Sequence, residues 1–419
     1  MNVLRKNIIS LFVLQGANYI LPLVTIPYLV RVLGPANFGR IAFAQAFIQY
    51  FVMLTDYGFN LSATRDIARA EGDKAAISTI FNAVLGVKLL TMLAGFIVMT
   101  GIAQLVPTMR ADYPLFALSY LAVVGNALFP VWLYQGTQRM GYITAFTMVA
   151  RTLVVLTIFI TVRQQDQYLR AAGLLALGMP LAGVVALVWA ARVTGVRFAW
   201  PRWSAMKKAV VDGWHVFTGV MSVTLFSNSN VFVLGLMTNP EIVGYFAAAE
   251  KLVRAVTGLT APVAQATYPH ISRLIKNSTE NAWKFIKRMG YIQGVATMIS
   301  SLVLLLMSDQ LVNAVYGLKM LDAAGIVKII SFLPFIIGLN NLMGTQIMLN
   351  IGMSREFSTA LMLTGVFNII IVGPLILFMG ANGAAVALIS SEILECIIMS
   401  YRLTKRKTLF MKPAVQYNN

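Results

Sequence analysis

The sequence predicts an all-α integral membrane protein with about twelve transmembrane helices in two six-helix lobes around a central cavity. Of the 419 residues, 58% are hydrophobic and 11% are charged, and the mean hydropathy is +0.75. About a quarter of the residues in a soluble domain are charged. Apolar runs recur roughly every 30–40 residues, and each is near the ~20 residues that a helix needs to cross the hydrocarbon core. A transmembrane β-barrel would instead show alternating segments of about ten residues.

The predicted spans leave no room for a separate soluble domain. The longest connections, residues 192–212 and 269–290, are shorter than the ~50 residues that a folded domain needs. In chain order the predicted spans are Ile8–Val30, Ile41–Leu61, Ile80–Leu105, Leu115–Tyr134, Tyr142–Val162, Ala171–Arg192, Val216–Leu236, Ile242–Tyr268, Tyr291–Ser308, Ala323–Leu349, Phe357–Met379 and Gly383–Tyr401.

Basic residues concentrate in alternate connections, which predicts the orientation. Cytoplasmic loops of membrane proteins carry an excess of Lys and Arg, so we expect both termini in the cytoplasm. The same distribution assigns the net charge of +18 to the membrane surface and not to nucleic acid. The opposite connections hold only Arg31, Arg40, Arg110, Arg163, Arg170 and Lys319.

A repeated spacing predicts that the chain has two related halves. A Pro-xxx-Gly turn followed by a polar helix occurs twice, and duplicated halves are common in transporters. We expect an N-lobe at 1–195, a basic cytoplasmic linker at 196–213, a C-lobe at 214–401 and a basic cytoplasmic tail at 402–419. The second copy, Pro240, Gly244, Glu250 and Arg254, matches the spacing of Pro35, Gly39, Gln45 and Gln49.

Charged residues inside the predicted spans are the main candidates for a functional site. Each costs roughly 2.5–3.5 kcal/mol near the bilayer centre on insertion scales, so such residues normally face a protein or water-filled interior. Cations outnumber acids, and a cationic interior suits a phosphate or pyrophosphate group. The cations are Lys88, Arg151, Lys251, Arg254 and Lys328, and the acids are Asp56, Glu250, Glu392 and Glu395.

Lys88 and Arg254 are the first candidates to contact an anionic substrate, and Arg151 and Lys251 the second. The alternative for Lys88 and Arg254 is an ion pair with Asp56 or Glu250. Arg151 lies close enough to a span end for its side chain to reach the interface.

Polar side chains in the spans are candidates for lining the cavity or coupling transport to an ion. Amides can hydrogen-bond sugar hydroxyls without a charge, although hydrogen bonds between helices explain them nearly as well. This group comprises Asp56, Glu250, Gln45, Gln49, Asn230, Asn341 and Glu392.

Motifs for metal binding and hydrolysis are absent from the sequence. His215 and His270 stand apart from any Cys or acid at ligand spacing. There is no Walker A sequence, no G-x-S-x-G and no HExxH. We therefore expect neither a cofactor nor an enzymatic activity.

Four groups of residues form a recognisable pattern along nearly the whole chain. They are Arg31, Leu33, Gly34, Phe38 and Gly39 with Tyr50, Phe51, Asp56, Gly58 and Arg65; Trp132, Gln135, Gly136 and Met140; Asp212, Gly213, His215, Val216 and Phe217; and Tyr268, Pro269, Ile271 and Ser272. This pattern resembles that of Wzx-type O-antigen flippases, a family within the multidrug/oligosaccharidyl-lipid/polysaccharide exporter superfamily, and departs from it at Gln138 and His270.

This resemblance implies two six-helix lobes and a function. A flippase of this family would move undecaprenyl-pyrophosphate-linked O-antigen repeat units from the cytoplasmic to the periplasmic leaflet of the bacterial inner membrane. Alternating access would be coupled to an ion or proton gradient, and the other O-antigen assembly proteins, a polymerase and a chain-length regulator, would be partners. A multidrug or cation antiporter of the same fold is the alternative, followed by a membrane-embedded glycan polymerase or transferase.

Overall fold

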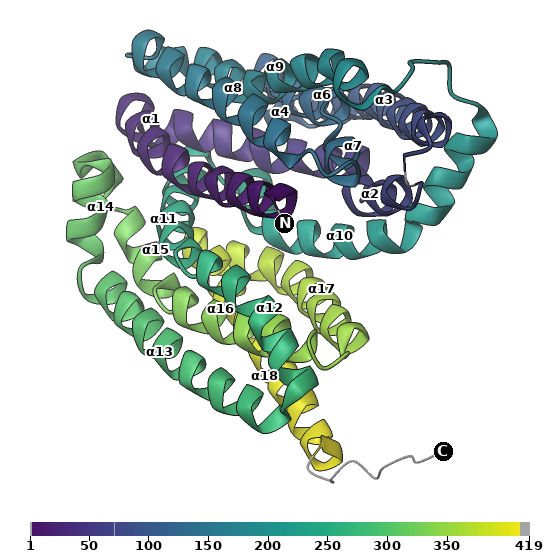
Figure 1. Cartoon of the computed structure of the whole chain (residues 1–419). Coiled ribbons are helices and arrows are strands. Elements are labelled where there is room, and N and C mark those ends of the chain that lie inside the picture. Colours follow the sequence, from purple (N-terminus) through teal and green to yellow (C-terminus); the bar gives the residue numbers. More distant parts are fainter. Residues whose placement is uncertain (1, 71, 411–419) are drawn as a thin grey trace. The chain divides into compact units, whose positions relative to one another are not determined.

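The computed structural model describes residues 2–70 and 72–410, and every regular element within these ranges is a helix (Figure 1). The side chains of 2–20, of 406–410 and of several positions within 222–276 are outside the description. The last part of the predicted basic tail, 411–419, also lies outside the described residues.

The elements follow one another with short connections. In chain order they are α1 (Asn2–Asp56), α2 (Phe59–Arg69), α3 (Lys74–Leu105), α4 (Pro107–Arg110), α5 (Tyr113–Ser119), α6 (Leu121–Leu128), α7 (Val131–Gly136), α8 (Met140–Thr161), the 3-10 helix η1 (Gln165–Gln167), α9 (Tyr168–Thr194), α10 (Trp203–Met237), α11 (Pro240–Gly258), α12 (Ala261–Asn277), α13 (Thr279–Leu306), α14 (Ser308–Tyr316), the 3-10 helix η2 (Leu318–Met320), α15 (Ala323–Ile330), α16 (Leu333–Asn341), the π-helix η3 (Leu342–Met348), α17 (Ser354–Met379) and α18 (Ala381–Phe410).

Helix α1 contains the first two predicted spans, joined at a break in the helix. Gly34 adopts φ 75° and ψ 173°, outside the helical region, and Pro35 follows it. Glycine reaches positive φ without a steric penalty, and proline suits the start of the next helical segment because it has no N–H to donate. The non-helical backbone of Gly34, followed by Pro35, therefore separates the two spans.

The fold is that of a multi-pass membrane protein. Among the described residues, nine helical segments are long and apolar enough to cross a bilayer, and the first of them runs through the Gly34 break. Many large apolar side chains point outward, such as Ile97 (72% exposed) and Phe378 (86% exposed). The predicted seventh and eighth spans correspond to α10 and to α11 with α12. The prediction of about twelve helices in an all-α membrane fold is confirmed.

Two of the predicted spans are interrupted helices. The eighth changes from α11 to α12 at Leu259 and Thr260. The tenth consists of α15, α16 and the π-helix η3, which follows directly after Asn341. Interrupted and π-helical turns leave backbone groups that need other partners, and they occur often at functional sites.

The two copies of the Pro-xxx-Gly turn pack against each other through their glycines. A Cβ atom added to Gly39 would overlap the carbonyl oxygen of Pro240, and one added to Gly244 would overlap that of Pro35. The helices that begin at Pro35 and Pro240 therefore approach backbone to backbone, which only glycine permits. The repeated spacing in the sequence corresponds to this reciprocal contact.

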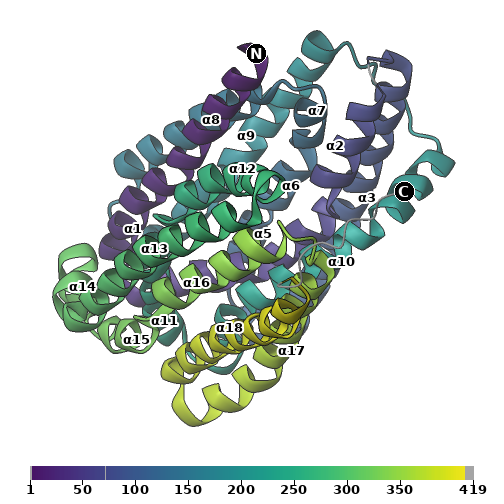
Figure 2. The ribbon, with the colours of Figure 1, turned by 60° about the horizontal axis from the view of Figure 1, so that its bottom comes forward.

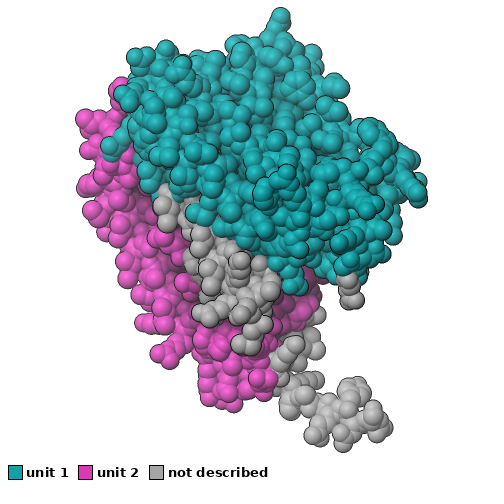
Figure 3. All heavy atoms as spheres, turned by 45° about the horizontal axis from the view of Figure 1, so that its top comes forward, with its two compact units in different colours: residues 1–244 teal, residues 245–419 magenta. Residues whose placement is uncertain are grey.

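The chain divides into two compact units, Met1–Gly244 and Tyr245–Asn419, which have different colours in Figure 3. In the first unit α10 packs against α1, α2 and α3, around a core that includes Phe59, Phe81 and Trp132. In the second unit α13 packs against α12 and α16, and α18 against α16 and α17 (Figure 2). The lobe boundary predicted at 196–213 stays a prediction.

Candidate functional site

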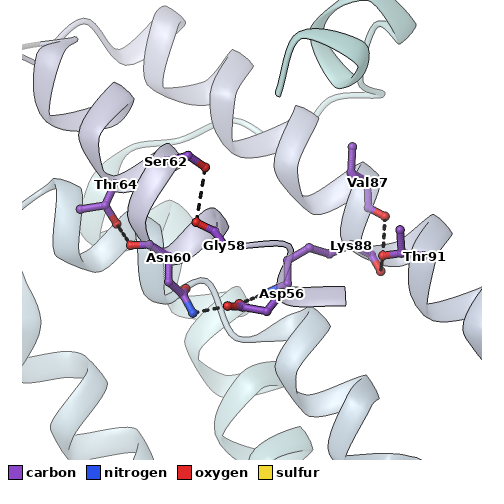
Figure 4. Close-up of polar contacts among 8 residues, drawn as sticks. All are labelled: Asp56, Gly58, Asn60, Ser62, Thr64, Val87, Lys88 and Thr91. Carbon is purple, nitrogen blue, oxygen red and sulfur yellow. Dashed lines mark hydrogen bonds and ion pairs between the residues drawn. The ribbon is translucent and has the colours of Figure 1, made fainter. Parts of the chain in front are cut away.

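The first charged cluster is an ion pair buried in the N-terminal unit. The Nζ atom of Lys88, on α3, lies 3.2 Å from Oδ1 of Asp56, the last residue of α1 (Figure 4). The Lys88 side chain is 1% exposed and that of Asp56 is 18% exposed. Nζ also lies 4.7 Å from the centroid of the Trp132 ring. A buried ammonium group needs such partners because water no longer solvates it.

A tight turn between α1 and α2 positions Asp56. Tyr57 and Gly58 both have positive φ, 48° and 75°, which is uncommon for a residue other than glycine. This turn brings Asn60 back to Asp56, and Asn60 Nδ2 donates to Asp56 Oδ1 at 2.8 Å (Figure 4). The carboxylate thus has one charged and one neutral donor.

Trp132 is a member of this cluster that its sequence position does not reveal. It belongs to the short helix α7 and is fully buried. The Thr64 hydroxyl donates to the backbone carbonyl of Trp132 at 3.3 Å, which joins α7 to α2. Sequence analysis found Trp132 only as part of a family resemblance, because its contact with Lys88 is made by tertiary packing.

The second charged cluster belongs to the C-terminal unit. On α11, Arg254 Nε donates to Glu250 Oε1 at 2.7 Å, one helical turn away. The Glu250 side chain is 10% exposed, whereas that of Arg254 is 41% exposed. Arg254 also experiences the charge of Glu392, on α18. Arg254 is therefore held by acids, and its side chain stays partly exposed.

Glu392 lies in a buried polar contact between α16 and α18. Asn340 Nδ2 donates to Glu392 Oε2 at 2.9 Å and to the Glu392 backbone carbonyl at 3.1 Å. The Oδ1 atom of Asn340 is buried without a partner. Glu395, three residues further along α18, is also buried. Two carboxyl groups at this spacing share one face of the helix.

The structure shows the ion pairs that the sequence left as the alternative for both leading cations. Lys88 pairs with Asp56 and is enclosed, while Arg254 pairs with Glu250 and stays partly exposed. Lys328 pairs with Asp309 at 2.7 Å, and both side chains are about half exposed. Of the two leading cations, only Arg254 combines charge in a span with an accessible surface.

The remaining candidate residues fall into different environments. Lys251 is half-buried beside Glu250 on α11, and Arg151 is half-buried on α8. The other amide candidates divide by exposure: Gln45 and Gln49 are exposed on α1, Asn230 is buried on α10, and Asn341 is half-buried on α16 with its Oδ1 atom enclosed and without a partner.

A further polar cluster contains residues that were not candidates from the sequence. Arg40 Nη1 lies 3.6 Å from Asp112 Oδ2, and the Tyr168 hydroxyl donates to Asp112 Oδ1 at 2.8 Å. A pocket of about 190 Å³ lies beside Arg40 and Asp112. The cluster joins α1, the start of α5 and α9, so no local spacing in the sequence predicts it.

Residues 4–275 match the family model described as polysaccharide biosynthesis protein. The chain belongs to this family. A protein of Escherichia coli (strain K12) named "Putative O-antigen transporter" is 34% identical over 412 residues, which cover 97% of this chain and 98% of that protein. A protein of Shigella dysenteriae with the same name is 28% identical, over 94% of this chain and 99% of that one.

Solved structures show which fold this polysaccharide biosynthesis protein has. The structure described as "Lipid II flippase MurJ, inward closed conformation" has a TM-score of 0.78 at 12% identity and covers 95% of this chain and 87% of its own. An inward-facing multidrug resistance MATE family transporter has a TM-score of 0.72 at 14% identity, over 98% of this chain and 100% of its own. At these identities the likeness shows the fold alone. The chain therefore has the fold of these membrane transporters. The family match and the two relatives named as O-antigen transporters confirm the resemblance to Wzx-type flippases.

Proposed function

We propose that this protein is a flippase for a lipid-linked oligosaccharide. It would move undecaprenyl-pyrophosphate-linked O-antigen repeat units from the cytoplasmic to the periplasmic leaflet by alternating access. The observation that carries this proposal is the 34% identity, over 97% of this chain, to the Escherichia coli relative named as an O-antigen transporter. The inner membrane would be its location, with both termini cytoplasmic, and the O-antigen polymerase and chain-length regulator would act on its product.

Arg254 is the group that we propose to contact the pyrophosphate or an acidic sugar. Its guanidinium group can form two parallel hydrogen bonds to phosphate oxygens, and its side chain is 41% exposed. Glu250 holds it through Nε, so the terminal nitrogens remain for a ligand. Lys251, on the same helix, would add positive charge. Arg151 is a separate candidate contact in the N-terminal unit, whereas Lys88 is enclosed there and would stabilise the fold of that unit.

Glu392 is our candidate for coupling transport to an ion or proton gradient. It is buried, it experiences the charge of Arg254, and its neighbour Asn340 has an unused acceptor. A proton or cation at Glu392 would weaken the attraction of this carboxylate for Arg254. Substrate binding at Arg254 and ion binding at Glu392 would then influence each other, as transport coupling requires.

Transfer of the lipid-linked sugar between leaflets tests this function. The full-length protein in liposomes should move a fluorescent polyprenyl-pyrophosphate oligosaccharide, and Arg254→Ala should reduce the rate about ten- to hundred-fold, the loss of one charge-assisted contact. Lys284→Ala is the matched control, because Lys284 and Glu280 form an exposed pair at the same spacing, also on one helix. Equal rates for the wild type and Arg254→Ala would remove Arg254 from the substrate site.

A cation antiporter of the same fold is the second candidate, because Glu392 and Glu395 lie buried on one helix face. An organic cation is therefore included as a parallel substrate in the same liposomes. Cation transport without transfer of the lipid-linked sugar would reject the flippase and direct attention to Asp56, Glu250 and Glu392.

A further inference from the structure

The C-terminal unit contains a second pocket, whose lining does not include the charged pairs described above. Its volume is about 650 Å³, within the range of small-molecule sites. Residues of α11, α12, α13 and α16 line it, and these helices belong to one unit. The α12, α13 and α16 ribbons lie next to one another in Figures 1 and 2. The lining is mainly apolar.

The rim of this pocket has the exposed apolar side chains expected of a surface in contact with lipid. Leu259 is 69% exposed, Ile292 is 60% exposed and Val263 is 48% exposed. The pocket also lies at the interruption between α11 and α12, at Leu259 and Thr260. An interrupted helix is tolerated in a membrane where its backbone groups find partners. Here the Leu259 and Thr260 N–H groups donate to the carbonyl oxygens of Val256 and Thr257.

Among the lining residues that the structure describes, one side chain is charged, and it is basic. Arg288 lies on α13, in the basic segment between the eighth and ninth predicted spans. The lining continues along α13 to Ser300, twelve residues further, which is about 18 Å at 1.5 Å per residue. The lining thus offers a long apolar surface with a cation at one end. This combination suits an amphiphile with one anionic head group and an elongated apolar chain.

We propose that this pocket binds the polyprenyl chain of the carrier lipid, with Arg288 contacting the phosphate bonded to that chain. The proposal rests on the proposed function, which supplies a polyprenyl-phosphate lipid as substrate. Val256, which lines the pocket, is two residues from Arg254 and points to nearly the opposite side of α11. The lipid chain and its phosphate would thus lie on one side of α11, and Arg254, on the other side, would contact an acidic sugar of the same substrate.

Photolabelling with a lipid that carries no sugar tests the pocket separately from transport. The full-length protein is placed in phosphatidylcholine vesicles with a polyprenyl phosphate that bears a photoreactive diazirine, and the labelled peptides are identified by mass spectrometry. We expect labelling of α11, α12 and α13. Unlabelled polyprenyl phosphate should remove the label, and the same concentration of phosphatidylglycerol should not.

Matched substitutions on one helix make the test specific. Ala296→Trp would fill the pocket and abolish labelling, whereas Val295→Trp, on an exposed neighbour outside the lining, would leave it unchanged. Arg288→Gln should raise the probe concentration that gives half-maximal labelling about ten- to hundred-fold. Lys287→Gln removes an adjacent exposed charge outside the lining and should have no such effect.

Three results would overturn this inference: labelling of other helices, equal displacement by phosphatidylglycerol, or equal labelling of Ala296→Trp and Val295→Trp. Transfer of the lipid-linked sugar is measured on the same vesicles. Normal transfer with no label at the pocket would refute the pocket and leave the flippase intact. Specific labelling without transfer would support the pocket and refute the proposed function.

Discussion

Replacing Lys88 with Met tests whether this buried cation holds the fold or contacts the substrate. The ammonium group lies 3.2 Å from Asp56 and 4.7 Å from the centre of the Trp132 ring, and the side chain is 1% exposed. Methionine has a similar length and can still fill the space against Trp132. The substitution therefore removes the charge with little change of volume, and leaves Asp56 without its charged partner.

We expect Lys88→Met to lower the free energy of unfolding by about 3 kcal/mol. Removal of one partner from a buried ion pair typically costs 3–5 kcal/mol, and the low end applies because Asp56 is 18% exposed and keeps the hydrogen bond from Asn60. The double variant Lys88→Met with Asp56→Asn removes both charges. It should recover to within about 1 kcal/mol of the wild type, since the uncompensated carboxylate is gone.

The free energy of unfolding is measured in mixed detergent micelles for the wild type, Lys88→Met, Asp56→Asn and the double variant. These four values give the coupling energy of the pair. Surface O-antigen in a strain that lacks its own transporter, at matched expression, gives the activity. Lys284→Met, in the exposed pair with Glu280, is the control and should change neither quantity. The reasoning fails if Lys88→Met leaves stability unchanged and abolishes activity, or if the double variant is as unstable as the single one.

Two further substitutions test the packing and the polar contact described above. Gly39→Ala places a methyl group against the backbone of the facing helix and should destabilise the protein by about 1–3 kcal/mol in the same unfolding assay. Gly101→Ala is the control, because its Cβ position has open space around it, and it should be neutral or stabilising by up to about 1 kcal/mol. Equal effects of the two substitutions would contradict the contact at Gly39. Asn340→Leu removes the side-chain donor to Glu392 and should cost about 1–3 kcal/mol; no loss of stability would show that this hydrogen bond does not hold the two helices together.

Much of the fold could be predicted from local patterns in the sequence. Apolar runs of spanning length determine the membrane helices, because the bilayer accepts only backbones that satisfy their own hydrogen bonds. Gly34 with Pro35 separates the first two spans by backbone geometry alone. The pair of Glu250 and Arg254 follows from their spacing, since residues four apart meet on a helix.

The tertiary structure decided how these charged residues differ. In the sequence Lys88 and Arg254 are equivalent, each a cation within a span with an acid available. Packing encloses Lys88 with Asp56, 32 residues away, and with Trp132, whereas it leaves Arg254 41% exposed. Exposure depends on the neighbours that other helices supply, and helical spacing carries no information about them.

The pocket beside Arg288 also depends on contacts between helices. Its lining comes from four helices, and each contributes ordinary apolar residues that the sequence would assign to lipid contact or helix packing. The sequence by itself therefore determined that this chain is a helical membrane protein with charges in its spans. Only the tertiary structure decided which of those charges are enclosed and which remain accessible, because burial results from contacts between segments that are distant in the chain.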